Sequence, residues 1–178
     1  MKIAIYIASA LVLVVALVIL SGALLPKRHV ASRKILLHRS PQEVFSLVSD
    51  FQAGPAWRRG VQQVTLQNSD PSRLRFVEKG KNGSIPVEVR ESSRPARLVT
   101  EIADKSLPFG GIWIFDISPS AEGCTLQITE RGEVYNPFFR FVSHFILGYQ
   151  GSINAYLEDV AKHFHESAPP TDSEPANF

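Results

Sequence analysis

The sequence has 178 residues, 44% of them hydrophobic, and a formal net charge of +2 at pH 7. That length is enough for one domain with its own core and leaves little chain for a second. A charge so near zero, without a basic stripe interleaved with aromatic residues, argues against a nucleic-acid partner. The single cysteine, Cys124, excludes an intramolecular disulfide and is compatible with a reducing compartment.

An uncharged apolar stretch covers residues 3–25. About 20 apolar residues span the hydrocarbon core of a bilayer, so this stretch predicts a transmembrane helix. The alternative is a cleaved signal peptide, because Ser21-Gly22-Ala23 resembles a cleavage site. The apolar run is longer than the ~7–15 residues of a typical signal-peptide core, however, and only Lys2 precedes it. We therefore expect residues 1–26 to form an uncleaved single-pass anchor in the cell membrane.

Basic residues lie mainly on the C-terminal side of this stretch, at Lys27, Arg28, Arg33 and Lys34. The positive-inside rule then predicts that the rest of the chain is cytoplasmic. The alternative is that some of these residues belong to the first strand of the domain and have no bearing on orientation.

The remaining chain divides by composition. We expect Pro26–Ala31 to be a short linker and residues 27–166 to form the domain. Residues 167–178 are rich in proline, serine and acidic side chains and have little apolar surface to bury, so we expect them to be disordered.

The clearest local signal is Ser40-Pro41-Gln42-Glu43, which follows a strand expected over Ser32–His38. Serine is a preferred helix N-cap, proline fits the first helical position, and a glutamate three residues after the cap completes a capping box. A short helix with an apolar face should follow. Gly54-Pro55 should end this helical region, just before Trp57.

Beyond Trp57 the hydrophobic period changes to two, which is typical of half-buried strands. Turn-forming residues, such as those at Asn68–Pro71 and Gly80–Gly83, separate the strands. Short strands with short turns favour an antiparallel meander. The strands are expected at Val64–Leu66, Leu74–Phe76, Ile85–Val89, Leu98–Ala103, Gly111–Ile117 and Thr125–Thr129.

Apolar residues recur at steps of three or four from Phe138 to Phe164. This period predicts one long amphipathic helix of about 40 Å, at 1.5 Å per residue. Such a helix could cover one whole face of a curved sheet.

The order of elements, together with the stretches SPQEVFSLVSDF, AWRRGVQQV, GGIWIFDISPSAEGCTLQITERGEV and NPFFRFVSHFILG, resembles the SRPBCC superfamily of START-like, Bet v 1-like and polyketide-cyclase-like proteins. The resemblance implies an α+β helix-grip fold, in which a curved antiparallel sheet of about six or seven strands wraps a long C-terminal helix. It also implies a deep apolar cavity between sheet and helix. Superfamily members bind lipids, sterols, quinones, polyketides or plant hormones there, and others are cyclases, hydroxylase components or chaperone activators. The fold alone does not choose among these activities.

Residues expected to face this cavity come from the meander and the C-terminal helix. By alternation Trp113 and Phe115 should point inward, and Ile112 and Ile114 outward, where they are either scattered exposed residues or a contact for a membrane or partner. The candidate ligand-binding residues are Trp57, Phe76, Val87, Val89, Trp113, Phe115, Glu130, Phe141, His144, Phe145 and Gly148.

Two of these candidates have competing interpretations. Glu130 should point inward, where a carboxylate needs a partner. It could hold a ligand hydroxyl or serve as an acid or base. Alternatively, a bulge at Gly132 changes its direction, or it simply pairs with Arg58, Arg59 or Arg140. Glu78 is a similar but weaker case. Trp57 is either an aromatic residue at the cavity rim, with its indole N–H near polar groups, or a plug in the junction of the short helices.

The sequence contains no metal-binding spacing, phosphate-binding glycine loop or nucleophile motif, so we expect no metal or cofactor. These observations favour a membrane-anchored protein that binds an apolar small molecule, such as a lipid, isoprenoid or polyketide-like compound. One alternative is a cyclase or dehydratase in which Glu130 works with a cavity histidine or tyrosine. Another is a protein-interaction module with a filled cavity and an exposed apolar patch such as Ile112 and Ile114.

Overall fold

The computed structural model describes residues 2–68, 70, 73–81 and 83–176. Ser69, Pro71 and Asn82 of the predicted turns lie outside these residues, as do the last two residues of the predicted disordered tail. The helical elements are α1 (Lys2–Leu24), α2 (Pro41–Ser49), η1 (Phe51–Ala53), α3 (Gly54–Trp57), α4 (Pro137–Val142), η2 (Ser143–Leu147) and α5 (Gly151–His163). The strands are β1 (Arg28–Leu37), β2 (Val61–Leu66), β3 (Arg75–Gly80), β4 (Gly83–Ser93), β5 (Arg97–Ile102), β6 (Phe109–Ser120), β7 (Gly123–Val134) and β8 (Thr171–Asp172).

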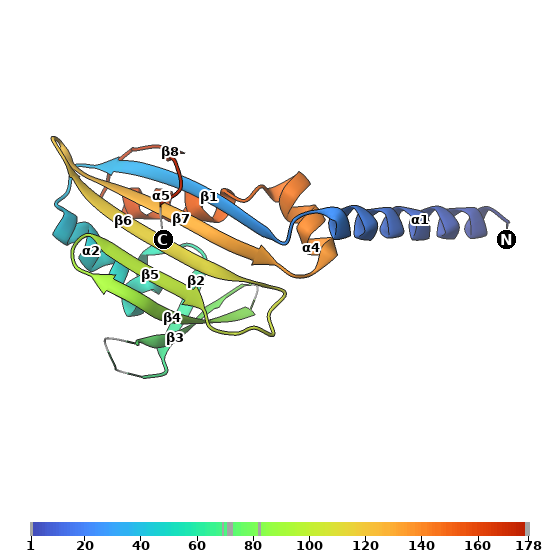
Figure 1. The fold of residues 1–178 in the computed structure, drawn as a ribbon, viewed down its shortest axis with the longest axis horizontal. Coiled ribbons are helices and arrows are strands. Elements are labelled where there is room, and N and C mark those ends of the chain that lie inside the picture. Colours follow the sequence, from blue (N-terminus) through green and yellow to red (C-terminus); the bar gives the residue numbers. More distant parts are fainter. Residues whose placement is uncertain (1, 69, 71–72, 82, 177–178) are drawn as a thin grey trace.

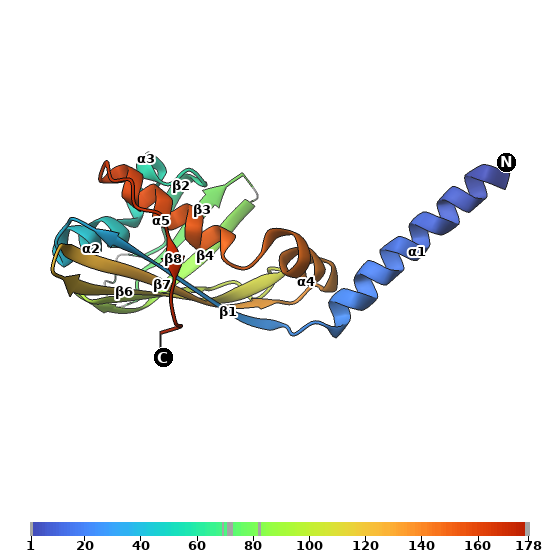
Figure 2. The same cartoon turned by 90° about the horizontal axis from the view of Figure 1, so that it is seen from above.

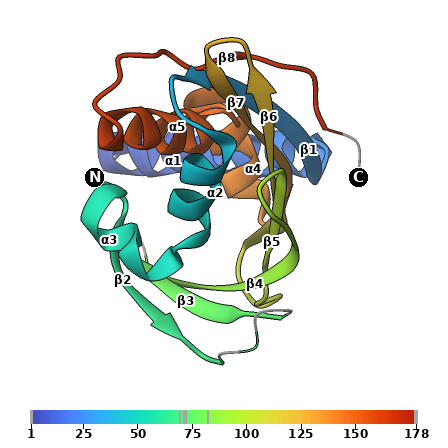
Figure 3. The ribbon, with the colours of Figure 1, turned by 90° about the vertical axis from the view of Figure 1, so that its left-hand side faces the viewer.

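The described strands form one antiparallel sheet of eight, in the order β2-β3-β4-β5-β6-β7-β1-β8. The sheet curves around α5, with α2 and α3 on the same side (Figure 3). This arrangement confirms the α+β helix-grip fold. α1 is a helix of 23 residues near the N-terminus, long and apolar enough to cross a membrane. It extends away from the sheet, with α4 beside its last turns (Figure 1).

The predicted capping box is present at the start of α2. The Ser40 side chain accepts a hydrogen bond from the Glu43 backbone N–H, and the Glu43 carboxylate accepts one from the Ser40 backbone N–H at 2.9 Å. These two bonds satisfy donors that a helix N-terminus otherwise leaves unpaired. The helix then buries Val44, Phe45 and Val48 against the sheet.

The C-terminal helical region is not one continuous helix, so that prediction is wrong. α4 leads into a π-helical turn, η2, which ends at Gly148 with φ of +71°, and α5 begins only at Gly151. A positive φ favours glycine and cannot continue an α-helix. Phe145 and Tyr149 keep the apolar spacing of four residues across this point, but Phe145 belongs to η2 and Tyr149 to the connection between η2 and α5. The α4–η2 segment therefore turns away from α5 (Figure 2).

The sheet begins earlier than the sequence analysis placed it. β1 starts at Arg28, inside the predicted linker, and pairs with β7 from Glu133 to Cys124. Arg28 donates to Glu133 at 2.7 Å. As a result His29 is part of the sheet.

The convex face of the sheet is crossed by the C-terminal tail, a stretch whose composition predicts disorder. β8 pairs with Arg33 and Lys34, and Ala176 donates its backbone N–H to Thr129 at 3.0 Å. Ile114, the register partner of Thr129, is 0% exposed. The prediction that Ile112 and Ile114 form an exposed outward pair is therefore wrong for Ile114, which points outward but is covered.

Cys124 lies at the start of β7 and is fully buried. Burial raises the pKa of its thiol from the usual 9.0 to about 11, and the charges of Glu166 and Glu43 act in the same direction. The thiolate is the reactive species, so Cys124 should react with a maleimide far more slowly than a free thiol at pH 8 and rapidly once the protein is unfolded in urea. Because the unfolded chain ionises this thiol first, its contribution to stability should decline as the pH rises from about 9 to 11. Equal labelling rates in native and unfolded protein would contradict this burial.

Candidate ligand-binding site

The concave face of the sheet has a filled half beneath α5. Three of the predicted ligand-binding residues, Phe76, Val89 and Phe115, are at most 4% exposed there. They belong to the hydrophobic core, which α5 completes with Ile153, Leu157 and Val160. Any contact of these three side chains with a ligand stays a prediction.

The other half of the concave face carries side chains that are only partly buried, and Val87, Trp113 and Tyr149 among them pack against the core. We call it the open end and define it by its half-buried residues, Val87, Ile102, Trp113, Glu130 and Tyr149. Trp113 pairs in register with Glu130, and Val87 pairs with Ile102, so these residues lie on neighbouring strands. Of the predicted set, Trp113 and Glu130 are direct register partners on β6 and β7, whereas Val87 lies on β4, on the far side of β5 from Trp113.

Aromatic rings form the boundary between the two halves. The ring of Tyr156 lies edge-on to Trp57 at 5.4 Å and to Trp113 at 5.7 Å between centroids. Burial raises the pKa of Tyr156 well above its ordinary value, so its hydroxyl stays neutral. The Trp57 indole nitrogen is buried without a hydrogen-bond partner among the described residues. The Trp57 ring packs against Tyr156 and His163 of α5, and within the described residues its N–H lacks the polar neighbours expected for a residue at the rim.

The inward-pointing Glu78 is balanced by Arg58. Their side chains are 17% and 19% exposed, and they form an ion pair in which Arg58 Nη2 donates to Glu78 Oε2 at 3.1 Å. The guanidinium also lies 4.9 Å from the centre of the Tyr156 ring, in cation–π contact. Burial opposes the charge of Arg58, but Tyr156 and Glu78 outweigh it and raise the pKa of the guanidinium.

Glu130 has partners that the sequence analysis missed. Its carboxylate lies 3.2 Å from His29 Nε2 and accepts a hydrogen bond from Ser152 Oγ at 3.3 Å. The predicted pairing with Arg58, Arg59 or Arg140 is wrong, since those side chains bind Glu78, Asp159 and the end of α1. The side chain of Glu130 is 18% exposed and that of His29 is 10% exposed.

The His29 ring stacks on Tyr149, with 3.9 Å between centroids and 15° between planes. Gly132 makes this position available, because a Cβ there would lie 2.3 Å from the His29 ring. His29, Tyr149 and Ser152 thus join Glu130 in a polar cluster at the open end. The sequence held no signal for His29, which lay in the predicted linker.

The remaining predicted ligand-binding residues do not face the sheet. His144, Phe145 and Gly148 are exposed on or just after η2, and Phe141 lies against Gly22 of α1. They gather beside α1, and the His144 ring also lies edge-on to Tyr149, with 6.1 Å between centroids, so His144 adjoins the polar cluster.

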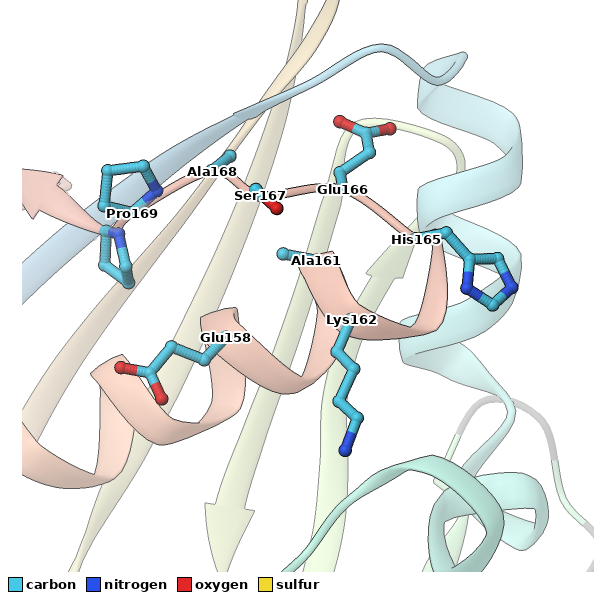
Figure 4. A pocket seen from close by; sticks show the side chains of 9 residues that line it. Glu158, Ala161, Lys162, His165, Glu166, Ser167, Ala168 and Pro169 are labelled. Atoms are coloured by element: carbon cyan, nitrogen blue, oxygen red, sulfur yellow. The ribbon is translucent and has the colours of Figure 1, made fainter.

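Two open surface hollows among the described residues lie outside the space between sheet and helix. One lies between the outer side of α5 and the tail, where the side chains of Glu158, Lys162 and His165 surround it (Figure 4). The other lies between α2 and the end of α5. Within the described part of the chain, no cluster of three histidine, cysteine or acidic side chains could hold a metal ion.

A curved sheet wrapped on a C-terminal helix, with a polar cluster at one end of its concave face, defines a protein of the helix-grip class. Residues 28–164 match the model of the family described as "Polyketide cyclase / dehydrase and lipid transport", and the chain belongs to this family. No curated protein matches the chain.

Similar solved structures show the same fold at low sequence identity. A START superfamily protein from Mycobacterium smegmatis is 19% identical, with a TM-score of 0.56 over 76% of this chain and 99% of that one. Norcoclaurine synthase from Thalictrum flavum is 10% identical, with a TM-score of 0.62 over 79% and 88%. The di-domain ARO/CYC StfQ from the steffimycin biosynthetic pathway is 12% identical, with a TM-score of 0.56 over 74% of this chain and 50% of that one.

The Arg58–Glu78 pair leads to a stability prediction. Replacing Arg58 by Met leaves the half-buried Glu78 carboxylate without its partner, which should lower the free energy of unfolding by about 2 kcal/mol. The double variant Arg58→Met/Glu78→Leu should recover more than half of that loss, because no charge is left behind. Urea unfolding of the full chain in a mild detergent would measure both. With the single variant Glu78→Leu measured as well, additive effects of the two single changes in the double variant would mean that the pair is not coupled.

Proposed function

We propose that this chain is a membrane-anchored domain that binds an apolar small molecule, such as a lipid, isoprenoid or polyketide-like compound, at the open end of its concave face. The family description, which names polyketide cyclases and lipid transport, supports an apolar ligand. The domain lies on the cytoplasmic side in this proposal, as the basic residues after α1 favour.

The observation that carries the proposal is the packing of α1 against the domain. Gly22 lies so close to α4 that a Cβ there would be 1.9 Å from the Pro137 carbonyl oxygen. Arg140, only 5% exposed, donates to the Leu25 carbonyl oxygen at 2.9 Å. A cleavage just after Ala23 would remove the contact of Gly22 with Pro137, so the packing supports an uncleaved anchor. It also supports a fixed approach of the open end to the bilayer.

The chemistry of the open end suits a largely apolar ligand with one polar group. Val87, Ile102 and Trp113 offer apolar walls, while Glu130 and His29 offer a charge and a hydrogen-bonding nitrogen. A few well-placed polar groups in an apolar site fix the orientation of a ligand.

Enlarging one wall of the open end tests this proposal. The variant Val87→Trp puts a large ring into the site, whereas Ser84→Trp adds the same ring to an exposed position on the opposite face of the same strand. We expect Val87→Trp to lower the amount of co-purified apolar molecule about tenfold, a loss of ~1.4 kcal/mol in binding. Ser84→Trp should leave it unchanged. Organic extraction and mass spectrometry of the full chain, purified from membranes, would measure the occupancy.

Circular dichroism would confirm that both variants fold. A wild-type chain that stays empty, even after incubation with lipids and isoprenoids, would overturn the binding proposal. Equal occupancy in Val87→Trp and wild type would mean that the ligand does not bind at the open end.

The contact between Glu130 and His29 favours a second candidate, a cyclase or dehydratase. A carboxylate 3.2 Å from an imidazole nitrogen, beside the Tyr149 ring, provides the proton donor and acceptor that such a reaction needs. In this case Glu130→Gln should abolish turnover while the ligand still binds. Glu122→Gln, at an exposed acid in the β6–β7 turn, is the matched control.

The assay would follow the extracted ligand by mass spectrometry for loss of water or ring closure on incubation with the protein. Turnover that is equal in wild type and Glu130→Gln would exclude this role of Glu130. A ligand that wild-type protein leaves unchanged would favour binding alone.

A further inference from the structure

The α4–η2 segment exposes an apolar surface that the domain does not use for its own core. Its largest exposed side chains are Phe138 at 49%, Phe139 at 46%, Phe145 at 60%, Ile146 at 68% and Leu147 at 68%. Residues 137–147 include no acidic side chain. Monomeric soluble proteins rarely expose apolar side chains so closely grouped.

The depth of this segment along α1 is fixed by close contact. Gly22 meets Pro137 and Phe141, and it lies two residues before the end of α1 at Leu24, or about 3 Å along the helix axis. If α1 spans a bilayer, its last turn lies at the boundary between acyl chains and headgroups. The start of α4 must lie at the same level.

Arg140 prevents the segment from swinging away from this level. It points toward α1 rather than into solvent and donates to the carbonyl oxygens of Ala23, Leu25 and Tyr135, at 3.4, 2.9 and 3.3 Å. Carbonyls at the end of a helix lack partners within the helix, and a cation there also interacts favourably with the helix dipole. The cation of α4 is thus turned toward α1, while Phe138 and Phe139 on the same helix are exposed.

We propose that the α4–η2 segment inserts its exposed apolar side chains into the leaflet at which α1 ends, as a second membrane contact of the domain. The partner is the bilayer itself, at the boundary of headgroups and acyl chains, where amphipathic helical segments bind. This inference rests on the proposed membrane anchoring by α1. It deepens that proposal, because the open end begins directly after the segment, with Tyr149 one residue beyond Gly148. A ligand can then pass between leaflet and site without crossing water.

Fluorescence quenching in vesicles tests this insertion. Ile146→Cys in the full chain is labelled with an environment-sensitive dye and reconstituted into phosphatidylcholine vesicles carrying nitroxides either near the headgroup or deep in the acyl chain. Wild-type protein serves as the background, because Cys124 is buried. Ala16→Cys reports on α1, and Glu122→Cys reports on an exposed turn of the domain.

We expect the emission of the dye at position 146 to shift to shorter wavelength. The nitroxides near the headgroup should quench most of its fluorescence. The dye at position 16 should respond more strongly to the deep nitroxides, and the dye at position 122 to neither. Quenching at 146 no stronger than at 122, while position 16 is quenched, would overturn the insertion and leave the anchor intact. Self-quenching between labelled copies at 146, without quenching by lipid, would assign the surface to a second copy of the chain. Absence of quenching at position 16 would overturn both the proposed anchor and the proposed insertion.

Discussion

The contact between Gly22 and the backbone of α4 is the constraint on which the arrangement of the molecule depends. A helix that only needed to cross a bilayer could be joined to its domain by any flexible linker. Here the Pro137 carbonyl occupies the place of a side chain on α1, and Arg140 binds the carbonyls at the end of that helix. With α4 held there, the chain must turn back toward the sheet within a few residues. Gly148 and the π-helical turn before it make that turn, so α5 begins only at Gly151.

Much of the fold could be predicted because its signals are local. Alternation along each strand determines which side chains face the core, and the residues at Ser40 and Glu43 determine where α2 begins. The prediction of a continuous C-terminal helix was wrong because it, too, rested on a local signal. Periodicity reports which positions are apolar, and the spacing of Phe145 and Tyr149 is helical whether or not the backbone between them is. Only the positive φ at Gly148 separates the two cases.

The candidate site was less predictable, since its pairs join distant parts of the chain. The inward direction of Glu130 and Glu78 followed from alternation, but their partners did not. Glu130 meets His29 because β1 pairs with β7 in a register that places Ala31 opposite Glu130, about a hundred residues away in sequence. Composition around Pro26 favoured a linker, so His29 was not a candidate. A carboxylate that is only paired within the fold has the same sequence pattern as one that binds a ligand or transfers a proton. Sequence therefore does not distinguish these two roles for Glu130 and Glu78.

The short strand β8 has a consequence for how copies of this chain meet. Without it β1 would be an edge strand, and an unpaired edge is a template for strands of other molecules. β8 occupies only the part of that edge at Arg33 and Lys34, and the chain after it crosses to the convex face, where Gln127 binds the Glu174 carbonyl oxygen at 2.8 Å. The tail thus limits the pairing of β1 with strands of other copies. A chain cut before Thr171 would present β1 to its neighbours, all the more so if anchored copies share one membrane plane.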